Sequence, residues 1–145
     1  MLLLIHHAFR YLIALTGLAL VAYALYGVVK KRPHDQTIRQ LAITFRTMLD
    51  LGFFTGIVLV TTGFGFRSDL GVHVILMLLG TIVSHIVPAV MRKRRQEERT
   101  LMPYAVATTI ALVLVFLGGL VLRTPAEDAV DTAAAPAAVT SILSA

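Results

Sequence analysis

Four long apolar stretches, separated by short polar connections, constrain this chain more than any other feature of its sequence. They cover residues 2–29, 41–66, 70–91 and 102–122. Each has about 20 residues or more, the length that a helix needs to cross a hydrocarbon core of about 30 Å. Only 14% of the residues are charged, whereas soluble domains have about 25%. The sequence therefore predicts an all-α, polytopic membrane protein.

The short connections favour an up-down bundle of four transmembrane helices over residues 1–122. Residues 123–145 differ completely in composition, because they are rich in alanine and carry Glu127, Asp128 and Asp131. This tail is too poor in large apolar residues to form a core, so we expect an extended extramembrane segment. If the tail is ordered, its apolar residues should contact another chain.

The basic residues predict the orientation. Ten of the thirteen lie in two segments, residues 30–46 and 92–99. By the positive-inside rule, these two loops face the cytoplasm and both termini face outward. The net charge of +5 is then explained by topology and by contact with anionic lipid, and we expect no nucleic-acid binding.

Small residues indicate where the helices pack. One stripe of the first helix, at helical spacing, carries His6, Arg10, Ile13, Gly17, Leu20, Ala24 and Gly27. The second helix contains the small-xxx-small pair Gly52 and Gly56. Such faces permit close approach of helix backbones. They serve packing within the chain as readily as homo-oligomerisation, so the sequence leaves both open.

Three histidines lie at matching depths near the outer ends of the first and third helices: His6, His7 and His73. These two helices are diagonal neighbours in an up-down bundle, an arrangement that can hold a planar macrocycle between two imidazoles. His6 and His7 are about 100° apart on a helix, so only one faces inward, and the small-residue stripe selects His6. The alternative is that these histidines simply lie at the headgroup level.

His85 lies twelve residues after His73 and about 120° away around the helix. It matches the depth of Asp50 on the second helix. A carboxylate inside a membrane usually faces a partner, and the candidates for Asp50 are Arg46, one turn earlier, and His85. We interpret Asp50, His85 and Arg46 as a structural polar group, with proton or quinone chemistry as the alternative. His34, in the basic loop, is expected to be solvated, and Met77 to be a packing residue.

The stretches "HHAFRYL", "LDLGFFTGIVL" and "HVILMLLGTIVSH" resemble a group of small four-helix bacterial membrane proteins of cytochrome-b-like type. The matching positions are His6, Arg10, Tyr11, Asp50, Gly56, His73, Met77 and His85. The resemblance implies a bacterial inner-membrane protein that binds haem. The second histidine at position 7 departs from the pattern. Members of the group have Asp or His at the position of Asp50, and only a histidine there would help to build an inner haem site.

Two functions are consistent with these features. The first is a b-type haem protein that transfers electrons in a respiratory or photosynthetic membrane, with quinone as a potential partner. His6 and His73 would bind the iron, and Arg10 and Arg67 would pair with the propionates. The second is a haem-free accessory subunit that contacts other membrane subunits. We find no nucleophile–base pair or phosphate loop, so independent enzymatic activity is not expected.

Overall fold

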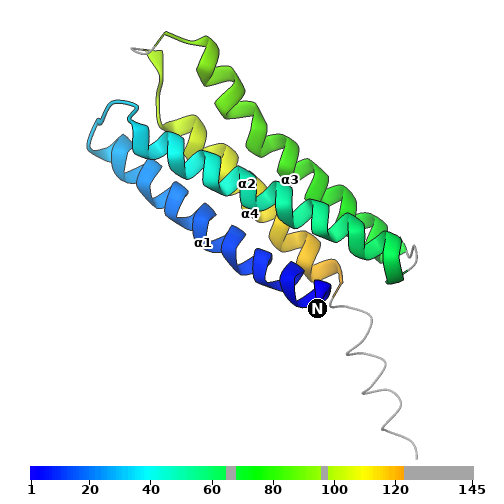
Figure 1. Cartoon of the computed structure of the whole chain (residues 1–145). Helices are drawn as coiled ribbons and strands as arrows, with labels where there is room; N and C mark the ends of the chain where they lie inside the picture. The colour runs from blue at the N-terminus through cyan, green and yellow to red at the C-terminus, as the bar shows by residue number, and fades with distance from the viewer. Residues whose placement is uncertain (65–67, 96–97, 123–145) are drawn as a thin grey trace, which may run out of the picture.

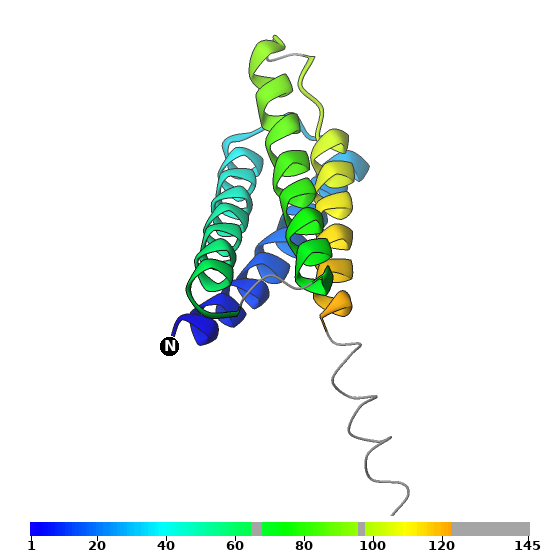
Figure 2. The ribbon, with the colours of Figure 1, turned by 90° about the vertical axis from the view of Figure 1, so that its right-hand side faces the viewer.

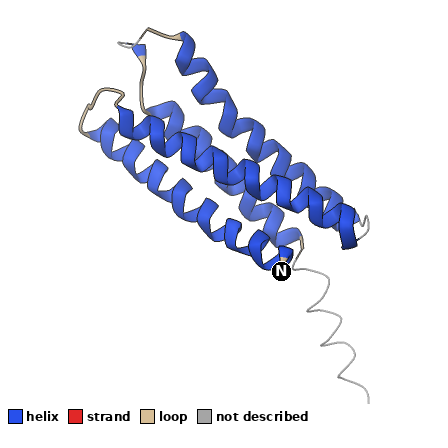
Figure 3. Cartoon of the chain, viewed as in Figure 1, coloured by secondary structure: helices blue, strands red, loops and turns tan. Residues whose placement is uncertain are grey.

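The computed structural model describes residues 1–64, 68–95 and 98–122, and within these ranges the chain forms helices and connections without a strand (Figure 3). The helices are α1 (Leu2–Val29), α2 (Gln36–Leu59), α3 (Ser68–Lys93) and α4 (Met102–Val121), and a π-helical turn, η1 (Val60–Phe64), continues α2. All four α-helices are long and apolar enough to cross a membrane. The predicted all-α fold with four spanning helices is confirmed, and it is that of a multi-pass membrane protein. The predicted tail, residues 123–145, lies outside the described residues.

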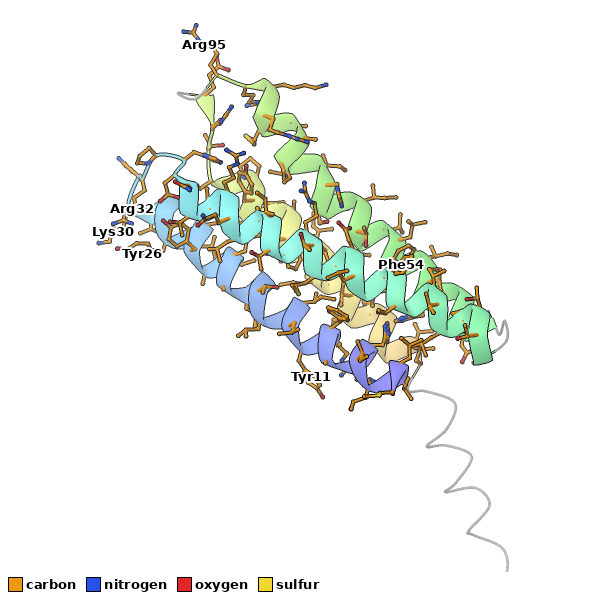
Figure 4. All side chains as sticks on the ribbon, viewed as in Figure 1. Tyr11, Tyr26, Lys30, Arg32, Phe54 and Arg95 are labelled. Atoms are coloured by element: carbon orange, nitrogen blue, oxygen red, sulfur yellow. The ribbon has the colours of Figure 1, made fainter. Side chains whose placement is uncertain are left out.

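The helices form an up-down bundle in which each packs against two neighbours (Figures 1 and 2). Helix α1 contacts α2 and α4, and α3 contacts the same two helices, so α1 and α3 lie on a diagonal. The α1–α2 and α3–α4 connections lie at one end of the bundle and the N-terminus lies at the other (Figure 1). Lys30, Arg32 and Arg95 lie at the end with these two connections (Figure 4). Both basic segments are therefore on the same side of the bundle, which we call the basic end.

The small-residue faces are used for packing within the chain. The buried residues of α1 are Ile13, Gly17, Leu20, Ala24 and Gly27, all from the predicted stripe. A Cβ atom on Gly17 would lie 2.7 Å from both Leu112 Cδ2 and Phe45 Cε2, and one on Gly52 would lie 2.9 Å from Ile13 Cδ1. These glycines allow α1 to approach α2 and α4 closely, so their faces are already covered.

Helix α2 begins at Gln36, five residues before the apolar stretch. Asp35 is the N-cap residue of this helix, because its Oδ1 accepts a hydrogen bond from the Ile38 N–H at 3.0 Å. The Tyr23 hydroxyl donates to the other carboxylate oxygen and, as the main cause, holds the pKa of Asp35 below its ordinary value. The polar first turn therefore extends the helix beyond the apolar span.

His34 is not freely solvated, so that prediction is wrong. Its ring is half-buried, and its Nε2 lies 3.1 Å from the hydroxyl of Tyr104, a buried residue at the start of α4. Burial is the main cause that lowers the pKa of His34, and the nearby Arg99 adds to it. The packed loop therefore favours neutral His34, with the α1–α2 connection held against α4.

Acidification should weaken this contact. A histidine whose pKa is lowered by folding contributes stability above its ordinary pKa of about 6.5, and this contribution is lost as the pH falls through the lower folded value. We therefore expect the thermal midpoint in detergent to fall between about pH 7 and about pH 5, and to fall less in a His34→Gln variant. Equal slopes for the two proteins would contradict this account, as would a His34 NMR titration at or above the ordinary value.

Candidate functional site

The structure brings His6 and His73 together at the end of the bundle where α1 begins. His6 is half-buried on α1, whereas His7 is exposed, in agreement with the choice made from the small-residue stripe. His73 is only 9% exposed on α3. The centroids of the His6 and His73 rings are 6.5 Å apart, and the ring planes meet at 73°. Two imidazoles from diagonal helices therefore meet inside the bundle.

His73 has a defined tautomer because its partner can only accept. Its Nδ1 lies 2.7 Å from the carbonyl oxygen of Gly118 on α4, so Nδ1 carries the proton and donates it. In the neutral ring, Nε2 is then left with a free lone pair. In metal-binding histidines, the ring nitrogen that does not bind the metal usually donates a hydrogen bond, often to a backbone carbonyl.

His6 is held in the same way. Its Nδ1 lies 3.3 Å from Oγ1 of Thr55 on α2. The Thr55 hydroxyl can donate its single proton to the backbone carbonyl of Leu51 or of Gly52, each at 2.9 Å. With the proton donated to either carbonyl, the hydroxyl oxygen can accept from His6 Nδ1–H, and this tautomer leaves a lone pair on Nε2 of His6.

The spacing of the two rings suits one metal ion between them. Metal–nitrogen bonds of about 2 Å on each side, with about 1 Å from each nitrogen to its ring centre, place the centroids about 6 Å apart. The observed separation is 6.5 Å. Two glycines make room for the rings, since an added Cβ would lie 3.1 Å from His6 Cε1 at Gly56 and 3.3 Å from His73 Nδ1 at Gly118. The separation of the two ring centres is therefore compatible with one metal ion between the imidazoles.

Arg10 lies one turn after His6 and borders a groove of about 240 Å³ between α1 and α4. The groove is otherwise mainly apolar and includes Gly119, the neighbour of the glycine that binds His73. Arg10 is exposed, so it departs from the buried stripe and places its positive charge at the rim. Arg67, the second predicted propionate partner, lies outside the described residues. Met77 packs against the core as a half-buried side chain, as expected.

Asp50 and His85 form a separate pair between α2 and α3. Their Oδ1 and Nε2 atoms are 2.9 Å apart, so the side chains are within reach, as their equal depth predicts. Among the described residues, Asp50 forms no ion pair with the half-buried Arg46. The expectation that Asp50 does not face the lipid is wrong, because the pair lies on the outer surface, with His85 46% and Asp50 44% exposed. His85 contacts Asp50 on α2 and is not part of the His6–His73 pair, in agreement with its expected angular offset from His73.

No group of three or more potential metal-ligating side chains occurs within residues 1–64, 68–95 and 98–122, so multi-ligand metal sites of the zinc type are not found there. Comparisons of the chain with protein-family models, with curated proteins and with solved structures find no match. The geometry of the histidine pair is therefore the main guide to function.

The hydrogen-bond partners of the two imidazoles were not predicted from the sequence. A threonine hydroxyl and a backbone carbonyl are common groups, and neither Thr55 nor Gly118 has a distinctive pattern. The adjacent glycines at 118 and 119 do indicate a close approach between helices, and this pattern could have pointed to α4 as a neighbour of His73.

Proposed function

We propose that this protein is a b-type haem-binding subunit that transfers electrons within a membrane. The observation that supports this most is the His6–His73 pair, in which the ring centres are 6.5 Å apart and both Nδ1 atoms have hydrogen-bond partners, so that the Nε2 atoms can serve as ligands. His6 and His73 would hold the haem iron through neutral imidazoles. Bound haem would supply a one-electron redox centre.

The residues around the pair have defined tasks in this proposal. The Gly118 carbonyl and the Thr55 hydroxyl orient the imidazoles and increase their basicity through Nδ1. The guanidinium of Arg10, at the rim of the α1–α4 groove, would pair with a propionate carboxylate. His73, which is only 9% exposed, is shielded from water by its neighbours. Arg67 would pair with the second propionate.

We propose a membrane-dissolved quinone as the redox partner. The α1–α4 groove is lined in part by Leu18 and Phe116, which are both exposed. In a membrane, these side chains face the lipid, so a lipid-soluble carrier can reach the groove laterally. A respiratory or photosynthetic system in a bacterial inner membrane would provide such a carrier.

A haem-free accessory subunit is the second candidate. The observation that favours it is that the His6 and His73 rings already pack edge to face at 73°, a favourable arrangement for two planar rings. With both Nδ1 atoms satisfied, the histidines would then hold α1 and α3 together for contact with another membrane subunit.

A visible absorption spectrum of the protein purified from its native membrane separates these functions. A b-type haem protein gives a Soret band and, after reduction, sharp bands at longer wavelength. Absence of haem absorption from protein that is otherwise folded would exclude electron transfer through the histidine pair and would leave the accessory role.

The orientation can be tested with two threonines that are exposed at opposite ends of the bundle, Thr100 and Thr62. We propose that the basic end is cytoplasmic, because ten of thirteen basic residues lie in its two segments. The chain has no cysteine, so each single-cysteine variant carries one thiol, and any labelling comes from that position. Thr62→Cys should react with an impermeant thiol reagent in intact cells, whereas Thr100→Cys should react only after lysis. The reverse labelling pattern would show that the basic end faces outward.

A further inference from the structure

The Asp50–His85 pair lies on the outer surface of the bundle, within the membrane-spanning segments. Asp50 is near the middle of the apolar span Gln36–Thr62, and His85 is in the span Asp69–Lys93. Both side chains are nearly half exposed. Ionisable side chains within a membrane almost always face the bundle interior, a water-filled cavity or a polar partner. The surface that carries this pair is therefore incomplete in a single chain.

Within the part of the chain that the structure describes, the pair has one hydrogen-bond donor and one acceptor left to satisfy. A net-neutral pair is the least costly form in lipid. Such a pair is either a carboxylate with an imidazolium or a carboxylic acid with a neutral imidazole, and both forms carry two protons. One proton lies between Asp50 Oδ1 and His85 Nε2, which are 2.9 Å apart. The other must lie on His85 Nδ1, which is then a donor, while Asp50 Oδ2 remains an acceptor.

We propose that a second copy of this chain covers the pair, in a two-fold dimer formed by the outer faces of α2 and α3. A donor and an acceptor side by side are self-complementary: His85 Nδ1–H of each copy donates to Asp50 Oδ2 of the other. A two-fold axis along the membrane normal keeps both pairs at the same depth, and an interface of this type presents the same patch from each subunit. Hydrogen bonds between helices favour association in lipid.

The surroundings of the pair fit a helical partner. Neither the groove beside Arg10 nor the small cavity beside Ser84 includes Asp50 or His85, whereas sites for small molecules are concave. The neighbours one turn away on the same surface are exposed, among them Thr47 and Phe54 on α2 and Ile82 on α3. Phe54 is 65% exposed and points outward where α2 and α3 lie side by side (Figure 4).

The small-residue faces do not provide this interface. The added Cβ atoms that would clash at Gly17 and Gly52 meet side chains of the same chain, so these faces are closed by α1, α2 and α4. The outer α2–α3 face combines exposure with unsatisfied polar groups, and it is independent of the histidine pair and of haem.

Cysteine crosslinking in native membranes tests the dimer, since the chain has no cysteine of its own. Ile82, on the proposed interface, is 48% exposed, and Ile110, on α4, is a matched control at 46%. Ile82→Cys should give a disulfide-linked product at twice the mass of the chain, and Ile110→Cys should remain monomeric. A product of another mass at Ile82→Cys would show a different partner, and monomer alone would show that no second copy covers this face; either result overturns the proposal.

The polar pair itself is tested in the Ile82→Cys background. Replacement of both Asp50 and His85 with leucine removes the hydrogen bonds without leaving one charge unpaired, and it should lower dimerisation by about tenfold or more. The exchange Asp50→His with His85→Asp keeps one donor and one acceptor per chain and should restore the dimer. Circular dichroism checks that the helices remain. An unchanged crosslinking yield in the double leucine variant would overturn the proposal.

Discussion

Replacement of His73 with alanine is expected to abolish the haem absorption of the purified protein, whereas His85→Ala should leave it intact. His73 is nearly fully buried beside His6, and its Nε2 is free because Nδ1 donates to Gly118 at 2.7 Å. His85 is on the same helix, but its Nε2 is taken by Asp50 at 2.9 Å. In the proposed haem site, replacement of His73 would remove one of the two residues that hold the iron. The measurement is the Soret absorbance per mole of protein.

The first helix offers a second matched comparison. His6→Ala should reduce the Soret absorbance as strongly as His73→Ala, and His7→Ala should leave it near the wild-type value, because His7 is exposed and His6 is turned inward. Loss of haem in the His7 variant alone would show that the wrong histidine has been assigned. Full haem retention in both the His6 and His73 variants would contradict the pair as ligands.

Replacement of Gly17 with alanine should destabilise the bundle substantially. The added Cβ would lie 2.7 Å from Phe45 Cε2 and from Leu112 Cδ2. Leu112 has a flexible end that can move, but Phe45 is among the most deeply buried side chains. Overpacking of a well-packed core costs about 1–3 kcal/mol, which corresponds to a fall of about 3–10 °C in the thermal midpoint.

Gly119→Ala is the matched control, because an added Cβ there meets no atom within 4 Å. Its thermal midpoint in detergent should stay close to that of the wild type. If Gly17→Ala is as stable as Gly119→Ala, then α1 can move away from α2 and α4 without loss, and the proposed close packing does not limit stability.

Much of the fold follows from the sequence alone. Four apolar stretches of sufficient length require four helices in a membrane, because backbone groups in lipid must be hydrogen-bonded within their own segment. The spacing of small residues identified the buried face of α1 and selected His6 over His7. Equal depth on adjacent antiparallel helices predicted the contact between Asp50 and His85. These features depend on helix periodicity and length, which are local properties.

Some local details were missed because they depend on contacts with distant residues. The position of His34 after a run of basic residues predicts a solvated side chain. In the structure, its ring contacts Tyr104, which lies seventy positions later in the chain. The polar first turn of α2 has no apolar signature, and its start at Gln36 is fixed by the Asp35 cap. Hydropathy marks the part of a helix inside lipid rather than the end of the helix.

The sequence by itself determined the number of helices, their alternating directions and the depth of each histidine. The tertiary structure alone decided which groups satisfy these side chains and which way they face. It supplied Gly118 and Thr55 as the partners of His73 and His6, and it turned the Asp50–His85 pair outward although a carboxylate within a span reads as inward-facing. The physical reason is that periodicity fixes the relative angles of residues on one helix, whereas the rotation of each helix about its own axis depends on packing against its neighbours.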